Sequence, residues 1–198
     1  MYRDFRRIGR DMFLAGLVTS HGGNMSVRCG DRIIITRRGS MLGRLTHRDL
    51  VEVALRGDQG PVAEASSELP VHRQLYLHTP ALAIIHAHPP AAVAISLVAE
   101  ELVPLDAEGA LLLGRVPVVT AARLIGDPET GRLLARRLNQ ARAVLLRSHG
   151  SFVVGRSLEE AYRLTSCLEA SARIMLFAHL ATRHETWGSH RHQGRVPP

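Results

Sequence analysis

The strongest constraint on the fold is a short apolar segment that ends in two histidines and two prolines, AIIHAHPP at residues 83–90. A run of this length that stops at prolines is typical of a buried strand. Side chains two residues apart share one face of a strand, so His86 and His88 point together while Ala87 points toward the core. Two imidazoles one pleat apart suit two neighbouring positions on one zinc-like ion, although a polar strand end without an ion fits the same pattern.

A second short apolar run offers a third imidazole. RAVLLR, residues 142–147, predicts a buried strand that ends at Ser148-His149-Gly150, and SFVVG (151–155) is its continuation or its hairpin partner. Gly150 permits either a close backbone approach or a positive φ beside His149. A His-Gly pair alone is typical of an ordinary turn, so His149 gains weight as a ligand only beside His86 and His88.

The segment SSELPVHRQLYLH (66–78) predicts the start of a helix, with Ser67 as its N-cap and Pro70 in the first turn. Glu68 is the candidate acid–base residue, although the helix dipole alone favours a carboxylate there. Ser66 and Ser67 precede it, and free N–H groups at a helix N-terminus form an anion site. A phosphate cradle and a carboxylate are therefore adjacent in the sequence.

The segment HGGNMS (21–26) offers a second anion contact. Gly22 and Gly23 let the backbone approach a ligand, and Asn24 can donate its amide. An ordinary Gly-Asn turn between a helix and a strand fits the same letters.

Periodicity and turn residues predict the other elements within one domain, residues 1–183, which the polar residues 184–198 follow as a tail. A capping box at Ser157 and Glu160 begins a long final helix that runs to about Ala181. Strands and helices are mixed along the chain, which indicates an α/β or α+β fold and leaves the polarity of the sheet open. The other predicted elements are helices at 2–18, 90–99 and 128–139 and strands before Gly30, at 32–36, at 50–55 and at 114–119.

The composition excludes several mechanisms. All 25 basic residues are arginine, so no lysine can form a Schiff base or serve a phosphate-binding loop. Carbon–carbon chemistry would need another electron sink, of which a metal ion is the obvious one. The net charge of +7 indicates an anionic partner. Arginines occur along the whole chain and only 4% of residues are aromatic, which argues against nucleic acid.

The sequence carries no sign of a membrane or of an oxidising compartment. No apolar run is long enough to span a membrane, and the N-terminus has no signal-peptide core. Cys29 and Cys167 form neither a disulfide framework nor a metal-type spacing. We therefore expect a cytoplasmic protein without a membrane partner.

Five motifs, taken in order, resemble the class II aldolase/adducin superfamily across about residues 8–180. The resemblance is strongest to the members that cleave L-fuculose 1-phosphate. It implies a single three-layer α/β/α domain around a central, largely antiparallel sheet, assembled as a homotetramer. The motifs are Gly23-Asn24-Met25-Ser26, Thr36-Arg37-Arg38-Gly39, Ser66-Ser67-Glu68, His86-Ala87-His88-Pro89 and His149-Gly150.

The resemblance also implies roles for individual residues. It assigns Zn²⁺, or another divalent ion such as Mn²⁺ or Co²⁺, to His86, His88 and His149. Glu68 would be the catalytic acid/base and would fill a metal position when substrate is absent. The phosphate of a small sugar substrate would meet six residues, which are Gly23, Asn24, Arg38, Gly39, Ser66 and Ser67.

The activity that this implies is a class II aldolase, which cleaves a short phosphorylated ketose to dihydroxyacetone phosphate and an aldehyde through a metal-stabilised enediolate. Alternatives within the superfamily are a dehydratase of the methylthioribulose-1-phosphate type, an epimerase and a decarboxylase. A non-catalytic, adducin-like scaffold is the alternative from another class, and it need not keep the metal ligands.

The sequence departs from the family pattern in two places, the phosphate loop and the position of a tyrosine. Arg37 and Arg38 replace a proline and a Ser/Thr in the phosphate loop, and Ala121 stands where the aldolases of L-fuculose 1-phosphate have a tyrosine. An arginine can still bind a phosphate, even in a bidentate manner. For the missing tyrosine, the candidate substitutes in the tail are His184, His190 and His192.

Overall fold

The computed structural model describes residues 1–183, and its centre is a mixed sheet of eight strands in the order β3-β2-β1-β4-β8-β7-β6-β5. Neighbouring strands are antiparallel except for β6 and β7, which are parallel. The strands are β1 (Asn24–Cys29), β2 (Arg32–Thr36), β3 (Leu50–Ala54), β4 (Ala83–Ala87), β5 (Glu101–Leu102), β6 (Val116–Val119), β7 (Ala143–Leu146) and β8 (Gly150–Gly155).

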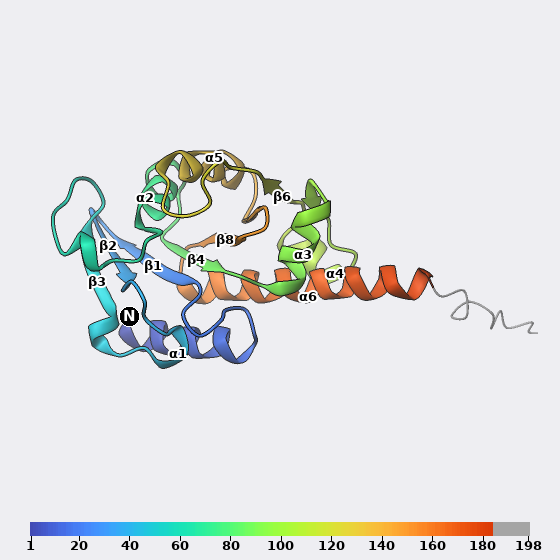
Figure 1. Ribbon diagram of the computed structural model, residues 1–198, viewed down its shortest axis with the longest axis horizontal. Helices are drawn as coiled ribbons and strands as arrows, with labels where there is room; N and C mark the ends of the chain where they lie inside the picture. The colour runs from blue at the N-terminus through green and yellow to red at the C-terminus, as the bar shows by residue number, and fades with distance from the viewer. Residues whose placement is uncertain (184–198) are drawn as a thin grey trace, which may run out of the picture.

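Helices cover both faces of this sheet (Figure 1). Ile84 belongs to the core beneath α2 and α5, whereas the next residue, Ile85, belongs to the core beneath α1, α3 and α6. This alternation along β4 places the central strand between two apolar layers, as expected for a strand that is buried on both faces. The three-layer α/β/α arrangement with a largely antiparallel sheet is therefore confirmed. The helices are α1 (Tyr2–Leu14), α2 (Leu69–His78), α3 (Pro90–Val98), α4 (Ala107–Leu112), α5 (Pro128–Leu138) and α6 (Leu158–Arg183), with 3-10 turns η1 (Leu42–Arg44), η2 (His47–Asp49) and η3 (Val62–Glu64).

The first helix is shorter than the sequence predicts. α1 ends at Leu14 rather than near Val18, because Gly16 adopts a positive φ of 69° and reverses the chain. The N–H of Leu17 donates to the carbonyl of Met12, and the N–H of Gly16 donates to that of Phe13. These two bonds form the Schellman arrangement that commonly ends a helix at glycine.

The other predicted elements agree closely with the structure, but the helix α4 and the two-residue strand β5 were not predicted. SFVVG is the hairpin partner of β7 rather than its continuation. At the start of α6, Ser157 Oγ accepts the N–H of Glu160, while the Glu160 carboxylate accepts the N–H of Arg156, so the capping box reaches one residue further back. α4 was not predicted; its N-cap Asp106 accepts the N–H of Gly109.

No helix within residues 1–183 has the length and apolar character needed to cross a membrane. The predicted tail, 184–198, lies outside the described residues, and so do its candidate residues His184, His190 and His192.

Candidate active site

The three histidines predicted as ligands lie together at one end of the central strands. His86 is on β4, His88 follows the end of that strand, and His149 is in the turn between β7 and β8. Because β8 pairs with β4 as well as with β7, both histidine-bearing segments reach the same place. One ring nitrogen from each residue lies within 4.8 Å of the other two, and His86 Nε2 is 2.9 Å from His88 Nε2.

The donor set fits a divalent cation. Four-coordinate zinc with Zn–N distances near 2 Å sets neighbouring nitrogens roughly 3.3 Å apart, a spacing within the range that these three rings span. His86 Nδ1 lies 3.0 Å from the carbonyl oxygen of Ser151, so the ring donates there and keeps Nε2 for a ligand. A histidine whose second nitrogen is held in this way is typical of a metal centre.

Gly150 permits the close approach of the two segments. A Cβ atom there would lie 2.3 Å from the carbonyl oxygen of Ala87 and 2.7 Å from Cδ2 of His88. The sequence left a positive φ as the other possible reason for a glycine here. Gly150 does not have one, and the residue with a positive φ in this turn is Ser148, at 62°. Gly150 is therefore needed for space and not for its backbone conformation.

The imidazoles are held in the neutral form that binds metals. Burial lowers the pKa of His86 well below its usual value, and the neighbouring His88 and His149 lower it further. Burial, followed by the charge of His149, lowers the pKa of His88 to about 4. Burial also lowers the pKa of His149, which the carbonyl of Leu124 partly offsets. At neutral pH these rings therefore do not need to lose a proton before they bind a cation.

Glu68 is a buried carboxyl group in the same pocket, with 3% of its surface exposed. Burial raises its pKa to about 7, and a hydrogen bond of 3.3 Å from the N–H of Gly126 opposes that rise. A carboxyl group with this pKa is present in both protonation states near neutral pH, as a general acid or base requires.

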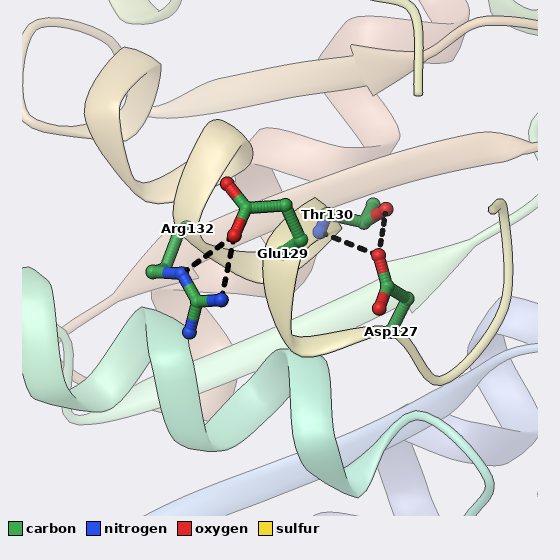
Figure 2. Close-up of polar contacts among 4 residues, drawn as sticks. All are labelled: Asp127, Glu129, Thr130 and Arg132. Carbon is green, nitrogen blue, oxygen red and sulfur yellow. Dashed lines mark hydrogen bonds and ion pairs between the residues drawn. The ribbon is translucent and has the colours of Figure 1, made fainter. Parts of the chain in front are cut away.

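The hydrogen bond to Glu68 comes from a loop that is tied to the start of α5. Asp127 caps that helix by accepting the N–H and the hydroxyl of Thr130, both at 3.1 Å (Figure 2). The Thr130 hydroxyl also lies 2.6 Å from the carbonyl oxygen of Arg123. Gly126 has a positive φ of 65°, and a Cβ there would lie 2.6 Å from the carbonyl oxygen of Ser67. The loop 121–127 is thus closed on itself and pressed against the segment that carries Glu68.

Every residue of the predicted metal, acid–base and phosphate-binding set lines one cavity of about 150 Å³. Gly22, which the sequence also offers for a close backbone approach, lines it too, together with four residues outside the predicted set. The predicted residues are Gly22, Gly23, Asn24, Arg38, Gly39, Ser66, Ser67, Glu68, His86, His88 and His149, and the additional ones are His21, Arg37, Ser40 and Ile125.

The two arginines of the phosphate loop differ in their contacts. The Arg37 guanidinium donates to the carbonyl of Arg48 and pairs with Glu64. The side chain of Arg38 is exposed and has no hydrogen-bond or ion-pair partner within residues 1–183. Arg38 is therefore the arginine that remains available for an anion.

The prediction that Ser67 caps α2 is wrong. Glu68 occupies the N-cap position, and no side chain caps the helix. Of the N–H groups expected to bind an anion, that of Ser66 already donates to the carbonyl of Thr36, while within residues 1–183 the N–H of Ser67 has no partner. The Ser66 hydroxyl accepts the N–H of Glu68 at 3.3 Å.

A buried polar cluster beneath the pocket was also not predicted. Ser26 Oγ lies 2.6 Å from His72 Nδ1 and 2.7 Å from the Tyr76 hydroxyl. The Phe152 ring stacks on His86 at 4.2 Å and meets His72 edge-on. The neighbours that orient His86 are on β8, and the sequence SFVV gives no indication of this role.

The loop that contacts Glu68 was also missed, although the turn residues Gly-Asp-Pro at 126–128 were a usable signal for it.

The family is shown by comparison with known proteins. The sequence model described as "Class II Aldolase and Adducin N-terminal domain" matches residues 3–176. The chain belongs to this family.

The names of individual relatives differ in the activity that they give. The crystal structure of L-fuculose-1-phosphate aldolase from Thermus thermophilus is 42% identical, with a TM-score of 0.89 over 92% of this chain and 95% of that one. Methylthioribulose-1-phosphate dehydratase from Acidiphilium cryptum is 32% identical over 84% of this chain and 85% of its own. The 3-oxo-tetronate 4-phosphate decarboxylase from Pectobacterium atrosepticum is 30% identical over 85% of this chain and 80% of its own.

The close fit at Gly150 predicts a strong effect of one methyl group. Gly150→Ala should weaken the binding of Zn²⁺ by at least about 10-fold, because the ligand-bearing segments must separate. It should also lower the free energy of unfolding by about 1–3 kcal/mol. Isothermal titration of the metal-free protein and urea unfolding measure the two effects.

Gly16→Ala is the control for this change. A Cβ there meets no atom within 4 Å, so only the positive φ costs free energy, about 1 kcal/mol, and metal affinity should not change. Equal metal affinity in wild type and Gly150→Ala would contradict the requirement for space.

The raised pKa of Glu68 predicts a pH-dependent stability of the metal-free protein. The folded-state pKa of about 7 exceeds the unfolded value of 4.5, so the stability contributed by the protonated carboxyl is lost as pH rises through this window. Glu68→Gln cannot ionise, and its stability relative to wild type should rise by about 2 kcal/mol between pH 5.5 and pH 8. Urea unfolding of both proteins at the two pH values checks this, and a difference that does not change with pH would contradict it.

Proposed function

We propose that this chain is a divalent-metal-dependent aldolase, a carbon–carbon lyase that cleaves a short phosphorylated ketose, such as L-fuculose 1-phosphate, to dihydroxyacetone phosphate and an aldehyde. One observation carries the proposal: three neutral imidazoles, a buried carboxyl group and an unpaired arginine line a single cavity within residues 1–183. The 42% identity to an L-fuculose-1-phosphate aldolase supports the aldol outcome.

In this proposal His86, His88 and His149 hold the ion, which is Zn²⁺, Mn²⁺ or Co²⁺, and Glu68 is a further ligand when no substrate is present. Imidazole and carboxylate donors suit all three ions. When bound, such an ion supplies Lewis-acid chemistry toward a carbonyl oxygen and its neighbouring hydroxyl. The chain has no lysine for the alternative, a Schiff base.

Glu68 carries the proton transfer at carbon. In cleavage, the hydroxyl on the departing carbon gives its proton to solvent water and becomes the carbonyl of the aldehyde, and the electrons of the broken bond move toward the ketone. Glu68 then delivers a proton to the carbon that received those electrons. In condensation, the ionised carboxyl group removes the same proton.

The other side of the cavity binds the phosphate group in this proposal. Arg38 supplies a charge that no acidic residue within 1–183 neutralises, and Ser67 supplies a free N–H group beside two hydroxyls. Charge-assisted hydrogen bonds of this kind are strong, and an arginine can bind a phosphate in a bidentate manner. Gly23, Asn24, Gly39 and Ser66 complete the predicted set.

A second reaction of the same site is the alternative candidate. A dehydratase of the methylthioribulose-1-phosphate type, an epimerase or a decarboxylase would use the same metal centre and the same negative charge beside a carbonyl. The observation in favour is the loop 121–127, which carries Ala121 and Ile125 and no tyrosine. A non-catalytic adducin-like scaffold would not need three histidines and a buried carboxyl group in one cavity.

The activity test uses two variants and a panel of ketose phosphates and phosphorylated 3-oxo acids, with dihydroxyacetone phosphate detected by a coupled reductase. His88→Ala should lose both the bound metal and turnover. Glu68→Gln should keep metal on the three imidazoles while turnover falls roughly 10²–10⁴-fold. His78→Ala, an exposed histidine on α2 outside the cavity, is the matched control and should behave as wild type.

Three outcomes would contradict the aldolase. A wild-type protein that takes up no added zinc would favour the scaffold. A metal-loaded protein that releases carbon dioxide or water from substrate without forming dihydroxyacetone phosphate would favour the alternative reactions. Full activity in His88→Ala would show that turnover does not depend on a metal ion held by His86, His88 and His149.

We also propose that residues 1–183 form the aldolase domain, that 184–198 is an appended tail, and that the domain assembles as a homotetramer. Large apolar side chains remain exposed on the outer part of α6, where Phe177 is 66% and Leu180 is 54% exposed. Sedimentation velocity should give four chains per particle, and the double change Phe177→Glu, Leu180→Glu should reduce that number. A wild-type protein that sediments as a single chain would contradict the assembly.

A further inference from the structure

One helix contacts both turns that carry the candidate ligands. α3 begins two residues after His88, and its buried Ser96 reaches the residue before His149. α3 lies against α6 in the structure (Figure 1). No residue of α3 lines the cavity, so the helix contacts only the segments that carry the ligands.

The first turn of α3 is fixed by a carboxylate from α6. Pro89 and Pro90 have no N–H, so the free donors at this end begin at Ala91. Glu169, only 3% exposed, accepts the N–H of Ala91 at 3.0 Å and that of Ala92 at 3.1 Å. The position of α3 beside His88 is therefore set by α6 rather than by the metal ligands.

Further along α3, Ser96 holds the turn before His149. Its hydroxyl accepts the N–H of Ser148 at 3.2 Å and donates to the carbonyl of Val93 at 2.6 Å. Ser148 has a φ of 62° and is the only non-glycine residue within 1–183 with a positive φ. This conformation is disfavoured for a residue with a Cβ, so it persists only where the surroundings impose it.

Arg147 ties the same turn to α3 and to the segment that follows it. Its guanidinium donates to the backbone carbonyl of Ser96 at 2.6 Å and to Thr120 Oγ1 at 3.0 Å, and it pairs with Glu100 at 2.7 Å. Ser96 thus contacts the turn through both its hydroxyl and its carbonyl. The turn cannot relax independently of α3.

We propose that Ser96 is a positioning residue for the metal centre: by holding Ser148 in its left-handed conformation, it sets the His149 ring against His86 and His88. This rests on the proposed function, because it takes His149 as a metal ligand. The ring of His149 lies 4.8 Å from that of His86 and 5.2 Å from that of His88. His86 is fixed within a strand, whereas His149 follows directly from the Ser148 peptide, so a change of φ at Ser148 moves the ring.

The test measures metal affinity and not turnover. Ser96→Ala should weaken the binding of Co²⁺ to the metal-free protein by roughly 10-fold or more, as loss of a group that orients a ligand typically does. The absorption spectrum of bound Co²⁺ should change, because one imidazole is displaced. Competition with a chromophoric chelator gives the affinity. Ser166→Ala, on α6 and away from the cavity, is the matched control and should leave both unchanged.

A rescue separates positioning from general loss of packing. Glycine adopts a positive φ without strain, so Ser96→Ala, Ser148→Gly should recover most of the lost affinity. A second pair keeps the proposal testable if Ser96→Ala does not fold, because Ser148 is exposed. Ser148→Asn, which tolerates this conformation, should bind Co²⁺ as wild type does, and Ser148→Val should bind it roughly 10-fold more weakly.

The outcomes are distinguishable from those of the proposed function. If wild type binds one Co²⁺ per chain and both Ser96→Ala and Ser148→Val bind it equally well, the role of Ser96 is overturned and the aldolase proposal stands. A loss in Ser96→Ala that Ser148→Gly does not restore also overturns it. A wild-type protein that binds no metal overturns the proposed function itself.

Discussion

The close packing of Gly150 against the end of β4 is the constraint on which the candidate active site depends. Central strands β4 and β8 pair antiparallel, so the end of one and the start of the other meet at one point of the sheet. The missing side chain at Gly150 lets the His149 turn come within reach of His86 and His88. The main chain sets this geometry, and neighbours from β8 fix the ring of His86: the Ser151 carbonyl binds its Nδ1 and Phe152 stacks on its face.

The same arrangement costs stability in the absence of a cation. His86 and Glu68 are almost completely buried, and the direction of each pKa shift shows that burial disfavours the charged form. A buried carboxylate needs a positive charge close by, and within residues 1–183 neither Arg37, which pairs with Glu64, nor Arg38 forms an ion pair with Glu68. A bound cation would supply that charge and would bind the neutral imidazoles without displacing a proton. The folded protein is therefore more stable with a cation bound in the cavity than without one.

Much of the fold and of the site follows from local sequence. The two apolar runs that end in histidine predicted β4 and β7, and the motifs around Glu68 and Asn24 predicted residues that the fold gathers into one cavity. One failure was local, because Gly16 ends α1 at Leu14. The others depended on tertiary contacts. Ser67 resembles an N-cap, yet Glu68 takes that position. The division of roles between Arg37 and Arg38 depends on Glu64, which no pattern near the arginines reveals.

The partners of His86 and Ser148 could not have been predicted for the same reason. Ser96 is one small polar residue within an otherwise apolar helix, and its hydroxyl could equally have bonded only to its own helix, as it does to Val93. Its second bond, to Ser148, exists because α3 is placed by Glu169 from a helix more than 70 residues later in the chain. A hydrogen bond such as that between Ser96 and Ser148 depends on how the helices pack in the folded protein, and the sequence of one segment does not reveal it.

Some residues of the cavity would serve all the candidate reactions, whereas others would decide which group can leave. In the proposed function, aldol cleavage or dehydration of a ketose phosphate and decarboxylation of a phosphorylated 3-oxo acid would all place negative charge beside a carbonyl. In each case the histidines would hold the ion, Glu68 would transfer the proton and Arg38 would bind the phosphate. The group that leaves must occupy what remains of the cavity. Among the described residues, its one apolar lining side chain is Ile125, on the loop closed by Asp127 and Thr130. Because that loop also bonds Glu68 through Gly126, a change that alters which group fits there also alters where the proton is held. Under the proposed function, substrate choice and proton transfer would therefore be coupled in this pocket through the loop 121–127.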